Sequence, residues 1–315
     1  MTDGMQAAKP IVIDCDPGVD DAIALLLAFA APELHLLGIT TVAGNVPLAL
    51  TQKNARRICE LAGCNDLGVY AGCSRPIMRS LATAEEVHGK TGLGTVHLPE
   101  PTMPLQPQHG VDFLIETLMT ASEPITLATL GPLTNVAIAL IKEPRIALKI
   151  PEVVLMGGAI GRGNVTSSAE FNIFVDPHAA HVVFTSGIPL TMIGLDVTHQ
   201  ILTTPERLAA IRAIATPVGQ IAAALLSDYT FEVEQHGFAG NPLHDPCVIA
   251  YLIQPDLFTS RKMRVDVEIA SELSLGRTVV DGLGGSNHHP NVNVVLSGDA
   301  DGFHRLLVER LSQLA

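Results

Sequence analysis

Short apolar runs alternate with amphipathic helical patterns through the first two thirds of the chain, and this alternation constrains the fold more than any other feature. The apolar runs are rich in β-branched side chains, which is typical of strands buried on both faces of a parallel sheet. A helical pattern follows most of them, which predicts βαβ units. The expected strands are Pro10–Ile13, Leu36–Val42, Gly68–Ala71, Ile125–Thr129, Val153–Met156 and Leu190–Ile193, and the expected helices are Asp20–Ala31, Leu48–Leu61, Val111–Ala121, Leu133–Ile141 and Pro177–Ser186.

The order of elements changes after Asp196. Helical patterns dominate Pro205–Ile253, and short strands are then expected at Val265–Ile269, Thr278–Val280 and Val292–Val295, before a closing helix at Asp299–Leu314. No Ser/Gly-rich linker, repeat or low-complexity tract interrupts the chain. We therefore predict one domain over residues 1–315. Its class is α/β, with a doubly wound, mainly parallel (mixed) sheet of Rossmann-like type and a helical insertion in the C-terminal third. The polar stretches 72–108 and 159–172 are expected to be long loops, which are commonly functional.

The composition indicates an ordered globular protein that binds small molecules. Hydrophobic residues make up 47% of the chain and charged residues only 16%. This low charge density predicts that part of the surface is covered in a homo-oligomer, a dimer or a tetramer. The formal net charge of −13 makes nucleic acid and anionic membranes poor partners, because both carry negative charge. A neutral or cationic small molecule or a metal ion fits better.

The cysteines and the N-terminus both point to the cytoplasm. Five cysteines occur without a CxxC pair, so reduced thiols are expected rather than a disulfide framework or a zinc knuckle. The first ten residues, MTDGMQAAKP, lack the basic and apolar regions of a signal peptide. The most apolar run, Ala22–Ala31, is too short to span a bilayer. We expect a soluble, cytoplasmic protein.

Four aspartates crowd the junction between the first expected strand and the first expected helix, in the sequence Asp14-Cys15-Asp16-Pro17-Gly18-Val19-Asp20-Asp21. In an open α/β sheet, ligands bind outside the carboxyl ends of the strands, which is where these side chains fall. No lysine or arginine lies between Lys9 and Lys53 to offset their charge. An all-oxygen ligand set of loose geometry favours Ca²⁺ over Mg²⁺ or zinc.

Other interpretations of this cluster remain open. A single aspartate at a helix start is commonly a helix cap, although four together are harder to explain in that way. The spacing of acids and glycine rules out an EF-hand loop. A phosphatase of the haloacid-dehalogenase class also places Asp-x-Asp after a strand, but it needs a threonine soon afterwards, where this chain has Pro17-Gly18.

Polar residues elsewhere could complete such a site. Asp245, at the start of an apolar helical run, could join the metal shell, and His244 beside it could reach the substrate, because histidine titrates near neutrality. The loop from Gly161 to Asn172 is rich in amide and carboxylate side chains that can hold sugar hydroxyls. Asn45 follows the second strand, and His88 lies in a glycine-containing loop. Taken alone, each of these residues is equally consistent with a cap, a turn or a solvated side chain.

Several of these motifs occur in the order found in a known family. The octapeptide from Asp14 to Asp21 resembles the signature of the inosine-uridine-preferring nucleoside hydrolases. The resemblance extends over nearly the whole chain. It includes Val42-Ala43-Gly44-Asn45, His88-Gly89, Gly131-Pro132-Leu133-Thr134-Asn135, Val154-Leu155-Met156-Gly157-Gly158, Ala169-Glu170-Phe171-Asn172 and His244-Asp245.

The resemblance implies a metal site and a general base. Asp16, Asp21 and Asp245 would bind Ca²⁺ through their carboxylates, and Leu130 through its backbone carbonyl, at a position that is commonly threonine in relatives. The metal would also hold one water and two ribose hydroxyls, and Asp16 would take the proton of that water. Cleavage of an N-glycosidic bond passes through an oxocarbenium-like state, which a carboxylate-rich pocket stabilises.

The resemblance also implies which residues surround the substrate. The ribose would be held by Asp20, Asn45, Asn164, Glu170 and Asn172, with Met156 under the sugar and Phe171 near it. Asp14 would support the site from behind. The departing base would take a proton or a hydrogen bond from His244, or else from His88.

Base preference should depend on the loop around His88 and on the segment Glu232–His244, which carries His236 and Phe238. This segment resembles the pyrimidine-preferring bacterial branch, although that branch often has tyrosine and glutamine at the positions of His236 and Glu232. The chain has no tryptophan, which argues against the purine-specific branch. Two other classes of protein remain open. One is a non-catalytic protein that binds Ca²⁺ and ribose, and the other is a metal-dependent phosphohydrolase.

Overall fold

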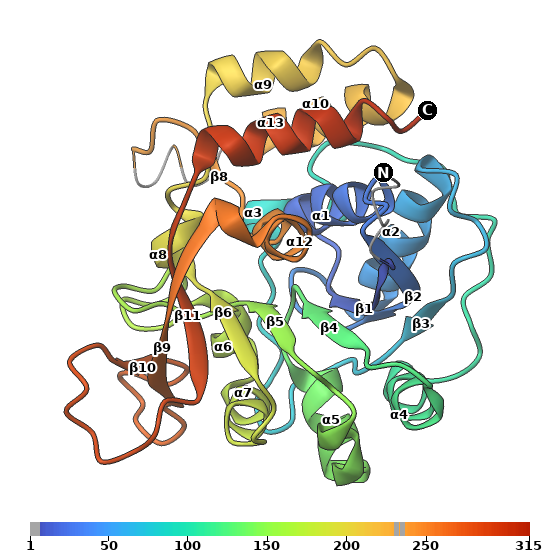
Figure 1. Ribbon diagram of the computed structural model, residues 1–315. Helices are drawn as coiled ribbons and strands as arrows, with labels where there is room; N and C mark the ends of the chain where they lie inside the picture. Colours follow the sequence, from blue (N-terminus) through green and yellow to red (C-terminus); the bar gives the residue numbers. More distant parts are fainter. Residues whose placement is uncertain (1–6, 230–232, 234–236) are drawn as a thin grey trace, which may run out of the picture.

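A single large sheet forms the centre of the computed structural model, which describes residues 7–229, 233 and 237–315 (Figure 1). Within the described residues, its order is β10-β9-β11-β6-β5-β4-β1-β2-β3. All neighbouring strands are parallel except in the pairs that β9 forms with β10 and β11, which are antiparallel. The strands are β1 (Lys9–Cys15), β2 (Leu34–Thr41), β3 (Val69–Ala71), β4 (Thr126–Thr129), β5 (Val153–Met156), β6 (Leu190–Ile193), β9 (Phe258–Val267), β10 (Thr278–Asp281) and β11 (Val292–Gly298).

Helices cover both faces of the sheet, because each central strand buries side chains on both sides. Ile11 and Ile13 of β1 pack into one core, and Val12 between them packs into the other. The first core lies under α1 (Val19–Phe29), α2 (Leu48–Leu61), α10 (Pro217–Asp228), α12 (Pro246–Ile253) and α13 (Ala300–Leu311), with α9 (Pro205–Arg212) outside them. The second lies over α4 (Gly110–Thr120), α5 (Thr134–Lys142) and α7 (Pro177–Phe184) (Figure 1).

This architecture confirms the predicted doubly wound, mainly parallel mixed sheet with a helical insertion. The order β3-β2-β1-β4-β5-β6 reverses direction between β1 and β4, which is where ligands bind in such sheets. Helices α9, α10 and α12 supply the insertion between β6 and β9. Among the described residues, no helix is both long enough and apolar enough to cross a membrane.

The structure also adds short elements that the sequence patterns did not predict. They are α3 (Glu85–His88), α6 (Phe171–Val175), α8 (Leu195–Thr198), the 3-10 helices η1 (Pro144–Leu148) and η2 (Pro255–Leu257), and the strands β7 (Leu202–Thr203) and β8 (Asn241–Pro242), which pair with each other. The last expected strands also have different bounds. β9 begins seven residues before Val265 and ends before Ile269.

Candidate active site

A cavity of about 270 Å³ lies at the carboxyl ends of the central strands. It is lined by eleven of the residues expected from the sequence: Asp20, Asn45, His88, Leu130, Met156, Asn164, Glu170, Phe171, Asn172, His244 and Asp245. They come from the end of β5, from segments that follow β2, β4 and β5, from α3, and from the starts of α1, α6 and α12. The expected site residue His236 lies outside the described residues.

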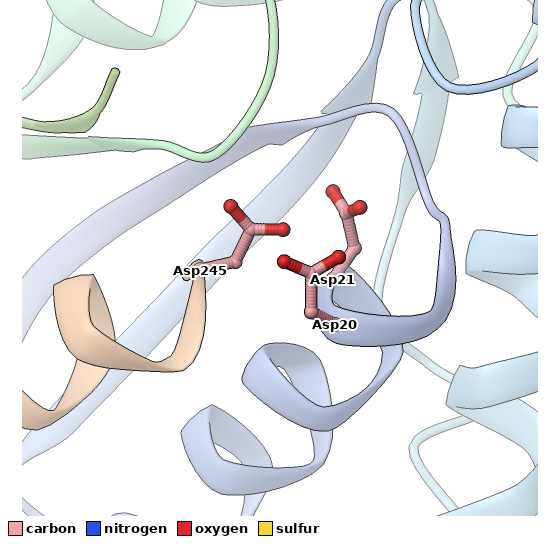
Figure 2. A group of neighbouring side chains, drawn as sticks. All are labelled: Asp20, Asp21 and Asp245. Atoms are coloured by element: carbon pink, nitrogen blue, oxygen red, sulfur yellow. The ribbon is translucent and has the colours of Figure 1, made fainter. Parts of the chain in front are cut away.

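Three carboxylates converge at the floor of this cavity (Figure 2). Asp20 and Asp21 are on the first turn of α1, and Asp245 precedes the first turn of α12. One oxygen of each lies within 4.8 Å of the others, and all three residues are buried. Asp20 therefore lies together with Asp21 and Asp245, two of the three aspartates that the family resemblance implies as metal ligands.

Asp16 lies beside this group with one oxygen held and one available. Its Oδ2 accepts a hydrogen bond of 2.6 Å from the backbone N–H of Asn45, and its Oδ1 is buried without a hydrogen-bond partner among the described residues. Glycines give the carboxylate its space. A Cβ on Gly44 would lie 2.0 Å from Oδ2, and one on Gly131 would lie 2.2 Å from Oδ1. Because a buried carboxylate oxygen without a partner is costly, Oδ1 is suited to a cation or a water that the protein alone does not supply.

Asn45 connects the two aspartates that follow β1. Its side-chain Nδ2 donates to Asp21 Oδ2 at 3.0 Å and to the backbone carbonyl of Asp16 at 3.3 Å. Asp21 Oδ2 also accepts from the N–H of Gly18, and its Oδ1 from the N–H of Asp16. Asn45, expected from the sequence as a ribose contact, therefore also fixes the orientation of both carboxylates.

Burial and mutual repulsion raise the pKa values of the whole acidic group. Burial, followed by the charge of Asp21, raises the pKa of Asp16 well above its usual range. Burial and the charges of Asp20 and Asp21 do the same to Asp245. The pKa values of Asp20 and Asp21 rise to about 6, mainly through burial. No lysine or arginine is among the described residues that line the cavity. The donor set therefore fits a hard divalent cation that prefers oxygen ligands, such as Ca²⁺.

The loop from Gly161 to Asn172, called the sugar loop below, has polar side chains that the surrounding backbone orients. Glu170 caps α6, because its carboxylate accepts from the N–H groups of Asn172 and Ile173, and it also accepts from that of Gly158. Burial raises the pKa of Glu170 to about 7. Asn164 Oδ1 accepts from the N–H of Phe171 at 2.9 Å, which leaves its Nδ2 group for a ligand.

Asn172 links this loop to the strand ends. Its Nδ2 donates to the carbonyl of Leu130 at 2.7 Å and to that of Met156 at 3.1 Å. Its Oδ1 is therefore the group left to accept from a ligand hydroxyl. The Leu130 carbonyl keeps a second lone pair, so this hydrogen bond does not prevent it from binding a metal.

The start of the same loop is anchored from distant parts of the chain. Thr278 on β10 is buried, and its hydroxyl accepts from the N–H of Ala159 at 2.9 Å and donates to the carbonyl of Ala159 at 2.7 Å. Asp196 accepts from the N–H groups of Ile160 and Gly161. The position of the sugar loop thus depends on the antiparallel edge of the sheet.

The two candidate histidines are both buried and neutral. His88 Nδ1 accepts a hydrogen bond of 3.1 Å from the N–H of Val19, so the proton of the neutral ring is on Nε2. His244 Nδ1 is 2.8 Å from the hydroxyl of Thr198. Burial lowers the pKa of His88 to about 4 and that of His244 to about 3. Full burial of the His244 ring thus holds its pKa below the near-neutral value usual for histidine, because burial disfavours the charged ring.

Comparison with known proteins identifies the family. The sequence model of the inosine-uridine preferring nucleoside hydrolases matches residues 11–305. This chain belongs to the inosine-uridine-preferring nucleoside hydrolase family. It is therefore an enzyme, a glycosidase that acts on N-glycosyl compounds, and the acidic cavity described above occupies the carboxyl edge of a nucleoside hydrolase sheet.

Individual relatives agree with this assignment. The pyrimidine-specific ribonucleoside hydrolase RihA of Escherichia coli is 47% identical over 307 residues, which cover 96% of this chain and 98% of that protein. A plant nucleoside hydrolase, PpNRh1, has a TM-score of 0.91 at 31% identity, covering 96% of this chain and 99% of its own. A purine-preferring ribonucleoside hydrolase from Gardnerella vaginalis has a TM-score of 0.91 at 34% identity, covering 97% and 99%.

The structure of this nucleoside hydrolase also shows cavity residues that the sequence analysis missed: Ala84, Glu86, Val87, Val165 and Tyr229. Most of them are neighbours in sequence of residues that were named. Tyr229 is different. It follows α10, belongs to no motif, and places its ring 5.6 Å from that of His88. Only the packing of α10 against the site reveals it.

Proposed function

We propose that this nucleoside hydrolase cleaves the N-glycosidic bond of ribonucleosides to free base and ribose, with Ca²⁺ as its cofactor and Asp16 as the base that activates water. The observation that carries the proposal is the pairing of two features at the cavity floor. One is the group formed by Asp20, Asp21 and Asp245, and the other is the buried, unpaired Oδ1 of Asp16 beside it.

The residues that would hold Ca²⁺ are Asp16, Asp21, Asp245 and the carbonyl of Leu130, with Asp20 close enough to share in the site. When bound, Ca²⁺ supplies positive charge that orients the attacking water and the ribose hydroxyls and lowers the pKa of that water. The raised pKa values of these buried acids support the assignment, because a bound cation favours the charged form that burial and the neighbouring carboxylates disfavour.

The remaining chemistry belongs to the side chains. Asp16 Oδ1, which has no hydrogen-bond partner in the part of the chain that the structure describes, accepts a proton from the water as the water oxygen attacks the anomeric carbon. As the bond to the base breaks, the surrounding carboxylates stabilise the positive charge that develops on the sugar. A single displacement of this kind inverts the configuration of the anomeric carbon.

Asp20, the Nδ2 group of Asn164 and the Oδ1 atom of Asn172 bind the ribose hydroxyls, with the carboxylate of Glu170 as a further acceptor. Asn45 lines the same region. Met156 and Phe171 cover the apolar face of the sugar.

The leaving base receives a hydrogen bond from a neutral histidine. His88 presents Nε2–H, because its Nδ1 accepts from the backbone. His244 does the same if Thr198 donates to its Nδ1. Since both rings are neutral, we propose that they stabilise negative charge on the departing base by donating hydrogen bonds.

We propose that the enzyme accepts inosine and uridine broadly and slightly favours pyrimidine nucleosides. The RihA relatives at 46–47% identity are described as pyrimidine-specific, and the chain contains no tryptophan for stacking on a purine. The purine-preferring structural relative is less similar, at 34% identity. A cytoplasmic location and a dimeric or tetrameric state remain predictions from the sequence.

A panel assay tests the proposal. The enzyme is incubated with purine and pyrimidine ribonucleosides and, separately, with a ribonucleotide, each with Ca²⁺ or with a chelator, and the release of free base and of free phosphate is followed. We expect base release that is fastest with uridine or cytidine and is abolished by the chelator. Calorimetric binding without base release would favour a non-catalytic protein, and phosphate release from a nucleotide would favour a phosphohydrolase.

A further inference from the structure

Asn135 lies on the first turn of α5 (Thr134–Lys142), which follows β4, and it has no part in the mechanism above. Asn135 is fully buried, and every hydrogen-bonding group of its side chain is used. Its Nδ2 donates to Asp14 Oδ1 at 2.7 Å and to the carbonyl of Thr41 at 3.1 Å. Its Oδ1 accepts from the N–H of Cys73 at 2.7 Å.

These three bonds connect the carboxyl ends of three adjacent strands. Asp14 is on β1, Thr41 ends β2, and Cys73 follows β3. The carbonyl of Cys73 in turn accepts from the N–H of Ala43, two residues before Asn45. One side chain on α5 thus fixes the spacing between the loops that follow β1, β2 and β3.

Two of these connections lead to Asp16. Along β1, Asp14 lies two residues before Asp16, and its backbone carbonyl accepts from the N–H of Leu130 at 2.8 Å. Along β2, the fixed Ala43 leads to Asn45, whose N–H holds Asp16 Oδ2. The orientation of Asp16 and the position of the Leu130 carbonyl therefore share Asn135 as a common support.

The position demands an asparagine. It needs two donors and one acceptor in a fixed plane, which a carboxamide supplies. An aspartate would lose both donors and place a second carboxylate against Asp14. The fit is also tight, because a Cβ on Gly72 would lie 2.2 Å from Asn135 Oδ1.

We propose that Asn135 is a positioning residue that sets the geometry of the Ca²⁺ site by tying the ends of β1, β2 and β3 together. This inference rests on the proposed Ca²⁺ site. Asn135 touches neither the metal nor the substrate, and it acts by holding Asp16 and Leu130 at the separation that the ion requires. Supporting residues of this kind change metal affinity about 10- to 100-fold when they are removed.

A matched pair of variants separates this role from a general loss of stability. Asn291, which is half-buried at the opposite end of the sheet, also donates two hydrogen bonds and accepts one, but all of its partners are backbone groups. Its Nδ2 donates to the carbonyls of Phe184 and Val265, and its Oδ1 accepts from the N–H of Val265. Asn135→Ser and Asn291→Ser each leave room for a water, and both are stripped with a chelator and titrated with CaCl₂ in a calorimeter.

We expect Asn135→Ser to bind Ca²⁺ at least tenfold more weakly than the unaltered enzyme, and Asn291→Ser to bind it within about twofold. Saturating Ca²⁺ should restore much of the activity of Asn135→Ser, because the catalytic groups remain. Equal Ca²⁺ affinities in the two variants would overturn the inference. If the unaltered enzyme binds no Ca²⁺, the proposed cofactor is wrong. If the unaltered enzyme binds Ca²⁺ and Asn135→Ser binds it equally well, only the role of Asn135 is wrong.

A second pair decides the question if Asn135→Ser does not fold. Thr40 Oγ1 is the other donor to Asp14 Oδ1, at 2.5 Å, and Thr191 Oγ1 donates to Glu152 at 2.5 Å at the opposite end of the sheet. Valine preserves the shape of threonine. Thr40→Val removes the bond to Asp14, and Thr191→Val removes the bond to Glu152 together with the weaker one that Thr191 accepts from Asn293 Nδ2. Thr40→Val should lose severalfold in Ca²⁺ affinity, whereas Thr191→Val should lose none. Equal affinities for this pair would also overturn the inference.

Discussion

At the scale of single residues, hydrogen bonding separates the roles of aspartates that have the same chemistry. Asp21 has both oxygens engaged by the backbone and by Asn45, so its orientation is fixed. Asp16 has one oxygen held and one unpaired. Asp14 is tied to Thr40 and Asn135 and lies away from the cavity. Among the described residues, Asp14 Oδ2 is likewise buried without a partner, but only Asp16 combines such an oxygen with a position beside the acidic group, which supports the proposal that Asp16 accepts the proton.

Asp16→Asn should lower kcat by about 10²- to 10⁴-fold, because the amide has the same shape but cannot take the proton of water. Steady-state release of base from uridine and inosine measures the effect, and circular dichroism checks the fold. Asp112→Asn, at an exposed surface acid, is the control and should retain full activity. Near-normal turnover by Asp16→Asn would remove Asp16 as the base.

His244→Ala and His88→Ala should slow cleavage of natural nucleosides much more than cleavage of p-nitrophenyl riboside. A nucleobase leaves with negative charge that needs a hydrogen bond, whereas p-nitrophenolate is stable without one. The ratio of kcat/KM for uridine to that for p-nitrophenyl riboside measures this, and we expect it to fall at least tenfold for the residue that assists the base. Equal losses on both substrates would show that the ring only shapes the pocket.

At the scale of elements, the site depends on how helices and loops are held against the strand ends. The sugar loop is fixed by α6, by Asp196 and by Thr278 of β10.

On the same face of the sheet as α1, helix α13 packs against the first core, and its buried His304 contacts β7. The His304 ring donates from Nδ1 to the carbonyl of Ala300 and accepts at Nε2 from the hydroxyl of Thr203.

His304 should make the stability of the enzyme sensitive to acid. Burial lowers its pKa from 6.5 to about 4. Because the pKa of His304 is lower in the folded state than in the unfolded state, its contribution to stability is complete above pH of about 6.5. That contribution is lost as the pH falls toward about 4. The free energy of unfolding should fall by on the order of 1–3 kcal/mol across this range for this group alone. Urea unfolding at several pH values compares the enzyme with His304→Asn, whose stability should change less, and parallel curves would contradict the assignment.

At the scale of the whole molecule, the acidic group joins parts of the chain that are remote in sequence. Asp21 starts α1 and Asp245 starts α12, and Figure 2 shows the two helix starts facing each other across the cluster. A cation bound there would link the N-terminal βα unit to the helical insertion.

Ca²⁺ should therefore raise Tm, and a chelator should lower it. At 100 times its Kd, a ligand that binds only the folded state stabilises it by about 2.7 kcal/mol, which is several degrees in Tm for a chain of this size. Thermal unfolding with CaCl₂ and with chelator measures the shift, and Asp245→Asn should largely abolish it. The same Tm under both conditions would contradict a structural contribution from Ca²⁺.

Local patterns predicted most of the fold, because buried strands and amphipathic helices leave a clear hydrophobic signature. The first half of β9 was missed because Thr259 to Lys262 are exposed and polar, so only pairing with β11 defines them as a strand. β7 and β8 are two residues each, too short for any periodicity. Their existence depends on contacts between distant segments.

The site was predictable where residues are adjacent in sequence, and less so where tertiary packing decides. Asp20 of the octapeptide, Asn45, and the loop residues Asn164, Glu170, Phe171 and Asn172 all line the cavity. The neutral state of His244 depends on burial, which a sequence pattern does not reveal. Tyr229 and the supporting role of Asn135 likewise depend on which strand ends and helices meet.

The two hydrogen bonds between Thr278 and Ala159 have a consequence for laboratory evolution of this enzyme. They make the hairpin of β9 and β10 the outer support of the loop that surrounds the sugar. Random mutagenesis selected for altered sugar recognition should therefore recover changes in this hairpin, in residues that never touch a nucleoside. A mutant library restricted to residues that line the cavity would omit this hairpin. The hairpin is one of the few places where a substitution can shift the loop without disturbing the aspartates of the acidic group.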